Sequence, residues 1–189
     1  MEENNPTYNK VNISTQKLLG GIGVILMLLG VLPFIGTALW IIGGILLILS
    51  IYQISNMIKK PEIFNKFIIG FVLGLSGWII AIVFGLMSFM SVAVFSGFMY
   101  AWSGIGVGII STMILFYFLF VGATYFYKEA YAMLGLAINH NLFKTAGLTM
   151  FIGAITIILF GIGGIVLFVG WILLAIAFFT APDEVELRA

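Results

Sequence analysis

Three polar side chains that follow one long apolar stretch are the candidates for chemistry in this chain. Lys128 and Glu129 come first, and His140, the only histidine, stands further on. If one helix continues through all three, Glu129 and His140 lie about three turns apart and share a face. A carboxylate and an imidazole on one face could bind a metal ion or pass a proton, but two ligands make a poor metal site. We therefore expect a polar stripe facing the cytoplasm, with no metal, no cofactor and no catalytic residue.

Other signatures of catalysis are weak. The chain contains no cysteine, which excludes a thiol nucleophile, a disulfide and a thiolate metal site. A serine hydrolase needs a base beside its serine, and the single histidine is expected at the membrane interface. The glycines at 104, 106 and 108 have GxGxG spacing, but the lysine of a phosphate-binding loop does not accompany them. The sequence therefore predicts a protein that is not an enzyme, and a net charge of +1 predicts no nucleic-acid-binding surface.

The composition indicates the environment in which these residues lie. Of the 189 residues, 62% are hydrophobic and 8% are charged, whereas a soluble domain has about 25% charged residues. Most of the chain consists of uncharged apolar stretches, and about 20 such residues cross a bilayer core of about 30 Å. The apolar residues run continuously and do not alternate, which favours helices over a β-barrel. The predicted fold class is an all-α integral membrane protein.

Six transmembrane helices, arranged as three helical hairpins, account for these stretches. The expected ranges are 14–32, 33–58, 63–90, 105–127 with an amphipathic continuation to 138, 142–160, and a last helix from an apex at 161–164 to about 181. They form one transmembrane domain over 14–181, between a polar N-terminal tail (1–13) and an acidic C-terminal tail (182–189). Counted from Leu18, the first helix is only about 22 Å long. The uncharged connection at 86–104 could extend both neighbouring helices, lie along the interface or re-enter the membrane as a pore-lining loop.

The first and third hairpins carry an internal repeat. When residues 17–53 are aligned with 144–180, about ten positions are identical, against about four expected from apolar composition alone. The matched residues include Lys17 with Lys144, Gly20 with Gly147, Gly36 with Gly163 and Gly43 with Gly170. An even number of helices in each hairpin gives both copies the same orientation, so the predicted repeat is parallel.

The distribution of charge sets the expected orientation. The connections after the first, third and fifth helices contain no Lys, Arg, Asp or Glu. Six helices place all the charged segments on one side, which the positive-inside rule makes cytoplasmic. We expect a multi-pass protein of the cell membrane with both termini in the cytoplasm. Lys17, Lys66 and Lys144 stand near the starts of the three hairpins, and we interpret them as anchors whose side chains snorkel to the interface.

A row of small residues is the sharpest local pattern. Gly70, Gly74, Gly77, Ala81 and Gly85 recur at steps of three or four residues, which keeps them on one face of the third helix. Such a face lets two helices approach closely in lipid. We interpret it as a helix-packing surface inside the protein, with an interface between subunits as the alternative.

These patterns leave three hypotheses for function. The leading one is a non-enzymatic structural or accessory subunit of a membrane assembly, whose partners are the lipid bilayer and either itself or other membrane subunits. Its basis is the small-residue face and the absence of polar residues deep in the spans. The alternative is a small channel or carrier for an uncharged or apolar solute, suggested by the parallel repeat and the 86–104 segment. An enzyme acting on lipid, with a pocket around Lys128, Glu129 and His140, comes third. Neither nucleic acid nor metal is an expected partner.

Four short segments resemble a known family. They are KLLGGIG (17–23), IFNKF (63–67), FKTAGL (143–148) and GWILLAIAFF (170–179). They are similar to those of small multi-span membrane proteins of archaea and some bacteria, catalogued as domain of unknown function nine-nine-six. The resemblance covers the chain from Lys17 to Thr180 and implies an integral membrane protein of a prokaryotic cell. It implies no activity and no functional residues.

Overall fold

The computed structural model describes residues 10–94, 98–159 and 161–186, and the side chains of these residues outside 88–108. Six helices make up most of this part: α1 (Ser14–Leu29), α2 (Gly36–Met57), α3 (Pro61–Val94), α4 (Phe98–Ala137), α5 (Leu142–Thr156) and α6 (Ile162–Thr180). Two short strands, β1 (Lys10–Asn12) and β2 (Glu184–Glu186), form a sheet that the sequence did not indicate. The predicted helical fold is otherwise confirmed.

Four of the helices are long and apolar enough to cross a membrane. They are α2, residues Pro61–Met87 of α3, residues Ile109–Ala137 of α4, and α6. The helices α1 and α5 are shorter, with 16 and 15 residues, which corresponds to about 24 and 23 Å at 1.5 Å per residue. These lengths are consistent with the membrane protein that the composition predicts.

Several helix boundaries differ from the expected ranges. Residues 30–35 form turns in which Phe34 adopts a φ of 69°, so α1 ends before them and α2 begins after them. Pro33 therefore precedes α2 and does not lie in its first turn. Pro61 is the first residue of α3, where its missing N–H costs no hydrogen bond. Proline thus starts the third helix, whereas the sequence placed it in the preceding connection.

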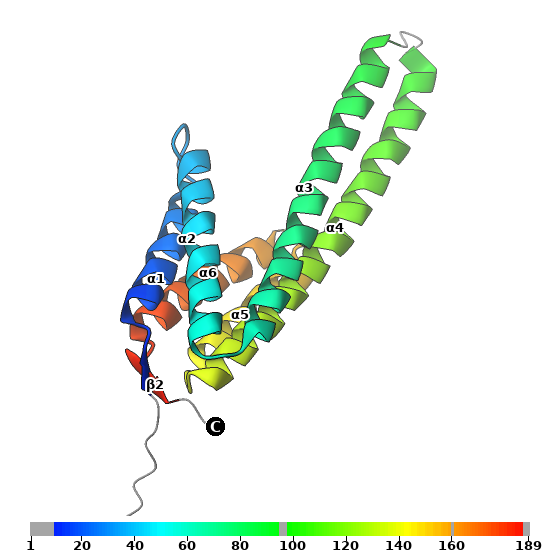
Figure 1. The fold of residues 1–189 in the computed structure, drawn as a ribbon. Helices are drawn as coiled ribbons and strands as arrows, with labels where there is room; N and C mark the ends of the chain where they lie inside the picture. The colour runs from blue at the N-terminus through cyan, green and yellow to red at the C-terminus, as the bar shows by residue number, and fades with distance from the viewer. Residues whose placement is uncertain (1–9, 95–97, 160, 187–189) are drawn as a thin grey trace, which may run out of the picture.

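The uncharged connection at 86–104 continues both neighbouring helices. The helix α3 extends to Val94 and α4 begins at Phe98, while residues 95–97 lie outside the described part. With 34 and 40 residues, these helices are about 51 and 60 Å long, against about 30 Å for a bilayer core. Figure 1 shows the α3–α4 hairpin leaning away from α2 and rising beyond the other helices.

The helices pack in chain order around a ring. Each helix contacts the next along the chain, and α6 returns to contact α1. The contact between α2 and α3 is the smallest of these six, so the ring is nearly open at one place. In Figure 1, α2 and α3 lie close together at the turn that joins them and diverge toward their other ends.

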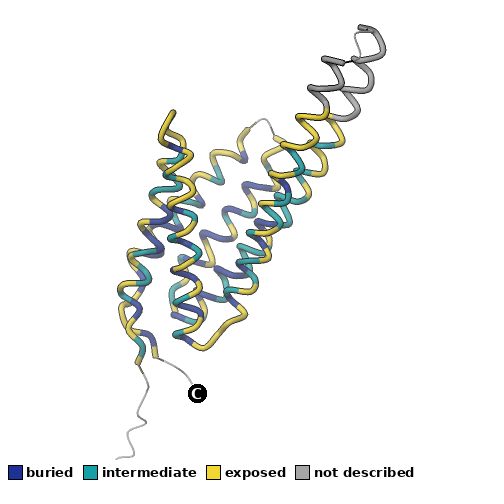
Figure 2. Tube along the Cα trace, turned by 45° about the horizontal axis from the view of Figure 1, so that its top comes forward, coloured by how far each residue is buried: buried dark blue, intermediate teal, exposed yellow. Residues whose placement is uncertain are grey.

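The buried core lies toward the end of the ring where α2 turns into α3. Large buried side chains at this end include Ile54, Ile63 and Phe143. At the opposite end, Val31 and Phe34 are 81% and 103% exposed, and Figure 2 shows exposed residues where α1 turns into α2. The bundle is therefore closely packed at one end and splayed at the other.

Charged segments gather at the packed end. The turns after α2 and α4, the end of α6 and strand β2 surround a polar pocket, lined by Lys60, His140 and Glu184 among others. Strand β1 pairs antiparallel with β2, and the Ile13 N–H donates to the Asp183 carbonyl oxygen at 2.8 Å. Residues expected in two separate polar tails thus form one ribbon, because their backbone groups pair with each other. Residues 1–9 and 187–189 of the predicted tails lie outside the described part.

Candidate functional site

The three polar candidates do not form one site. The helix α4 ends before His140, because Asn139 adopts a φ of 54° in the following turn. Glu129 and His140 therefore do not share the face that a helix continuing through both of them would have given. The Glu129 carboxylate pairs with the Lys128 ammonium at 3.1 Å, and the His140 Nε2 lies 2.9 Å from the Thr180 Oγ1. Among the described residues, no three His, Cys, Asp or Glu side chains lie together so as to hold a metal ion.

The three lysines that open the hairpins have different surroundings. The Lys17 side chain is only 11% exposed, and its ammonium lies 2.7 Å from the Asp183 carboxylate and donates to the Ala181 carbonyl oxygen. Lys66 lies over an aromatic ring of α4, 5.7 Å from its centroid, and Lys144 is exposed. Lys17 therefore ties α1 to the segment after α6, in addition to any anchoring that all three lysines provide.

The small-residue face of α3 lies against α4 at its first glycine and loosens along the helix. At Gly70, an added Cβ would lie 2.8 Å from a carbonyl oxygen of α4. At Gly74 and Gly77 the nearest atoms lie 3.8 and 3.5 Å away, and at Gly85 no described atom lies within 4 Å. Ala81 is half-buried. Gly74 and Gly77 also border a cavity, so enlarging them affects that cavity as well as helix packing.

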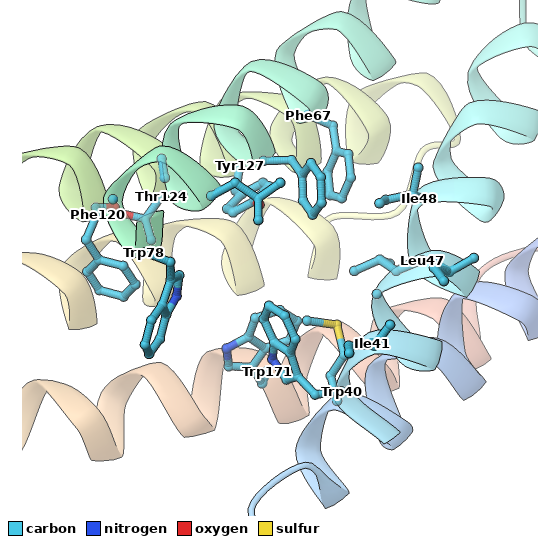
Figure 3. Close-up of a pocket in the computed structure, with 18 of the residues that line it drawn as sticks. Trp40, Ile41, Leu47, Ile48, Phe67, Trp78, Phe120, Thr124, Tyr127 and Trp171 are labelled. Carbon is cyan, nitrogen blue, oxygen red and sulfur yellow. Dashed lines mark hydrogen bonds between the residues drawn. The ribbon is translucent and has the colours of Figure 1, made fainter. Parts of the chain in front are cut away.

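A cavity of about 340 Å³ lies between α2 on one side and α3 and α4 on the other. Trp171 of α6 and Met27 of α1 contribute to its walls. Figure 3 shows Trp40 and Ile41 of α2, Trp78 of α3 and Trp171 around this space. The volume lies at the lower end of the range of about 300–1,000 Å³ that is typical of small-molecule sites.

The cavity opens to the outside along the contact between α2 and α3, which we call the open seam. Residues on both sides of the opening are about half-exposed: Ile45 is 52% exposed on α2, and Trp78 is 56% exposed on α3. The interior is closed, since Leu47, Phe67 and Tyr131 are at most 2% exposed. A guest could therefore enter from the side of the bundle, between two helices.

Few polar groups reach the cavity, and none of its described lining residues is charged. The Thr124 hydroxyl donates within its own helix, 3.1 and 2.9 Å from two carbonyl oxygens of the preceding turn. The rings of Tyr127 and Tyr131 stack with centroids 6.4 Å apart. Their hydroxyls make no hydrogen bond within the described part of the chain. Because no fully enclosed side-chain oxygen of the described residues lacks a partner, both hydroxyl oxygens keep some accessible surface.

The sequence contained a signal for this cavity that its interpretation missed. Trp and Tyr normally gather at the ends of membrane helices, at the level of the headgroups. Trp78 and Trp171 stand instead well inside long apolar stretches, and both line the cavity. Large aromatic residues far from helix ends could have indicated a lined space within the bundle.

Comparison with known proteins identifies relatives of this chain. A family model described as "Protein of unknown function (DUF996)" matches residues 39–172. The uncharacterized protein MJ1644 of Methanocaldococcus jannaschii is 33% identical over 181 residues, which cover 94% of this chain and 97% of the relative. No solved structure matches. The region matched by the family model contains every cavity-lining residue described above except Met27.

Proposed function

This chain belongs to the DUF996 family of proteins of unknown function, and we propose that it is a non-enzymatic membrane protein that binds an apolar molecule between α2 and α3. This proposal favours the carrier hypothesis over the accessory one. The observation that supports it is the apolar cavity with an opening between two helices that are long enough to cross a membrane. In that position the surrounding lipid can supply the guest directly, because no aqueous step separates the bilayer from the opening.

We propose that all six helices cross the cell membrane, with both termini in the cytoplasm. Lys60, His140 and Glu184 line one polar pocket, which supports the placement of the charged segments on the same side of the membrane. The positive-inside rule makes that side cytoplasmic. The lengths of α1 and α5, about 24 and 23 Å, fall short of a core of about 30 Å. Local thinning of the bilayer can accommodate such a shortfall at modest cost.

The parallel repeat is part of the same proposal, and matched glycine contacts support it. In the first hairpin, an added Cβ at Gly43 would collide with the carbonyl oxygen of Gly23. In the third hairpin, an added Cβ at Gly170 would lie 3.0 Å from the backbone nitrogen of Met150, which the repeat aligns with Gly23. The first and third hairpins therefore share a close glycine contact between their two helices. The middle hairpin, α3–α4, is the divergent one, and its residues form one side of the cavity.

The experiment that tests the proposal is native mass spectrometry of the protein extracted in mild detergent from its own membrane. The wild-type protein should carry an apolar molecule in a one-to-one complex. The variant Gly74→Phe should lose it, because the new ring fills space that borders the cavity. Gly85→Phe is the matched control on the same helix, since Gly85 does not line the cavity, and it should retain the bound molecule.

Two results would contradict the proposal. One is a wild-type protein that carries no apolar molecule, and the other is equal occupancy in the wild type and in a folded Gly74→Phe variant. Size-exclusion chromatography and thermal unfolding of each variant establish that it is folded before occupancy is compared.

A second candidate function is the accessory subunit, which the length of the α3–α4 hairpin favours. Both helices exceed the thickness of a bilayer core, and the described side chains along their far portions include exposed apolar residues such as Met87 (64%) and Met113 (66%). Apolar surface beyond the hydrocarbon core needs a protein cover. A foreign subunit retained at fixed stoichiometry in the same mass spectra would favour this function over guest binding alone.

A further inference from the structure

We propose that the guest is a neutral lipid, with a hydrocarbon chain in the cavity and an uncharged oxygen atom bound by the hydroxyls of Tyr127 and Tyr131. This inference rests on the proposed function and adds the chemical class and orientation of the guest. Four properties of the cavity support it: the absence of charge among its described lining residues, two hydroxyls without a hydrogen bond in the described part of the chain, its length, and the position of those hydroxyls along α4.

The walls of the cavity favour an uncharged guest. None of the described lining residues is Asp, Glu, Lys, Arg or His, and an ion taken from water into such a space loses its hydration without gaining a partner. The nearby Lys128 is engaged elsewhere, since its ammonium pairs with Glu129 and lies over the ring of Tyr125, 4.9 Å from the centroid. A free fatty acid or a phosphate group in the cavity would therefore lack a counter-charge.

The two tyrosine hydroxyls define the polar atom of the guest. Tyr131 is only 1% exposed, its ring packs 6.2 Å from the ring of Phe67, and its hydroxyl has no hydrogen-bond partner in the described part of the chain. Among the described residues no fully enclosed side-chain oxygen lacks a partner, so the Tyr131 hydroxyl oxygen keeps some accessible surface, through which a guest can reach it. Because a phenolic O–H donates, an ester, ether, ketone or hydroxyl oxygen of the guest satisfies it.

The length of the cavity fits the chain of a lipid in one leaflet. Its lining runs along α4 from Phe116 to Tyr131 and along α3 from Phe67 to Trp78, which corresponds to about 22 and 17 Å at 1.5 Å per residue. Half of a bilayer core is about 15 Å thick. An extended hydrocarbon chain can occupy this length, whereas a compact solute would leave part of it empty.

The position of the hydroxyls sets the orientation of the guest. Tyr127 directly precedes Lys128 and Glu129, the first charged residues after the apolar stretch of α4. That end of the cavity lies at the level where headgroups begin, while Trp78 and Phe116 lie at the far end. A lipid that enters through the open seam can therefore keep its oxygen at the interface and extend its chain along the cavity.

Quenching of tryptophan fluorescence tests the inference, because Trp40, Trp78 and Trp171 line the cavity and bromine quenches indole on contact. The probes are dodecane brominated at one end and dodecanol brominated at the end opposite its hydroxyl, compared at equal mole fraction in detergent micelles. The wild-type protein should bind the alcohol about fivefold more tightly than the alkane, since one hydrogen bond distinguishes them. The double variant Tyr127→Phe with Tyr131→Phe should lose this preference. Tyr125→Phe, the same change outside the cavity, should keep it.

The outcomes separate this inference from the proposed function. Saturable quenching by both probes that Gly74→Phe abolishes, but with equal affinities in the wild type, would overturn the assignment of a guest oxygen and leave apolar binding intact. A preference for the alcohol that persists in the double tyrosine variant would also overturn it. Quenching that is the same in the wild type and in Gly74→Phe would overturn the proposed function itself.

Discussion

Two adjacent glycines of α2 lie in opposite surroundings: Gly43 is in close contact with α1, whereas Gly44 faces open space. On the side of α2 that faces α1, a Cβ added at Gly43 would collide with the carbonyl oxygen of Gly23. Conversely, a Cβ added at Gly23 would lie 2.7 Å from the carbonyl oxygen of Gly43. We call this contact the closed seam. At the next residue, Gly44, which borders the cavity, no described atom lies within 4 Å of an added Cβ. One glycine brings two backbones together, and its neighbour leaves space at the open seam.

This difference shows why a count of glycines does not locate a binding site in a membrane protein. Small residues allow close approach of helices, but whether the partner helix approaches depends on the tilt of whole hairpins. Here α3 diverges from α2, and the space between them stays lined by aromatic side chains. The predictions below therefore contrast the closed seam with the open one.

The largest effect is expected from Gly43→Ala at the closed seam. The added methyl would meet the backbone of α1, including the Met27 nitrogen at 2.8 Å, and backbone cannot move aside as a flexible side chain does. Overpacking of this kind lowers the free energy of unfolding by about 1–3 kcal/mol. Unfolding in detergent, followed by circular dichroism against added denaturant, measures the change. An unchanged unfolding midpoint would show that the two helices are less tightly packed than described.

An intermediate effect is expected from Lys17→Met at the packed end of the ring. The substitution removes the ion pair with Asp183 and the hydrogen bond to the Ala181 carbonyl oxygen. Because the Asp183 side chain is 63% exposed, solvent screens the pair, and we expect a loss of about 1 kcal/mol in the free energy of unfolding. The same denaturant titration measures it.

Lys144→Met provides the matched control for that loss. Lys144 is the repeat equivalent of Lys17, is exposed, and has no ion pair within the described residues. Its replacement should leave the free energy of unfolding within about 0.5 kcal/mol of the wild type. Equal losses in the two variants would mean that both lysines act only as membrane anchors.

The smallest effect is expected from Gly44→Ala at the open seam. The methyl meets no described atom, and alanine restricts the unfolded chain more than glycine does, so we expect a gain of about 0.5 kcal/mol. The comparison with Gly43→Ala is direct, since the two changes are chemically identical and adjacent. A loss as large as that of Gly43→Ala would contradict the existence of free space at this seam.

The sequence predicted the number and order of the helices, because long uncharged stretches and charged connections are local signals. It did not predict the ribbon between residues 10–12 and 184–186, whose pairing joins the two ends of the chain and leaves no local pattern. The sequence placed the end of α4 at residue 138, one residue beyond the Ala137 at which the helix ends. It left open whether the uncharged connection at 86–104 extends the neighbouring helices, because an apolar stretch without charge does not distinguish a helix in the membrane from a segment along its interface. Hydropathy alone could not predict the cavity, because aliphatic residues such as Ile45 and Leu75 are equally compatible with contact to lipid and with contact to a guest. The mid-span positions of Trp78 and Trp171 were the available signal.

The most direct test of the account is an experimental structure of the protein crystallised from a lipid phase. We expect α2 and α3 to diverge as described, with an elongated density in the cavity that runs from the level of Tyr131 toward Trp78. A structure in which α2 packs directly on α3, with the indole of Trp78 facing the bulk lipid and no space beside it, would contradict the account.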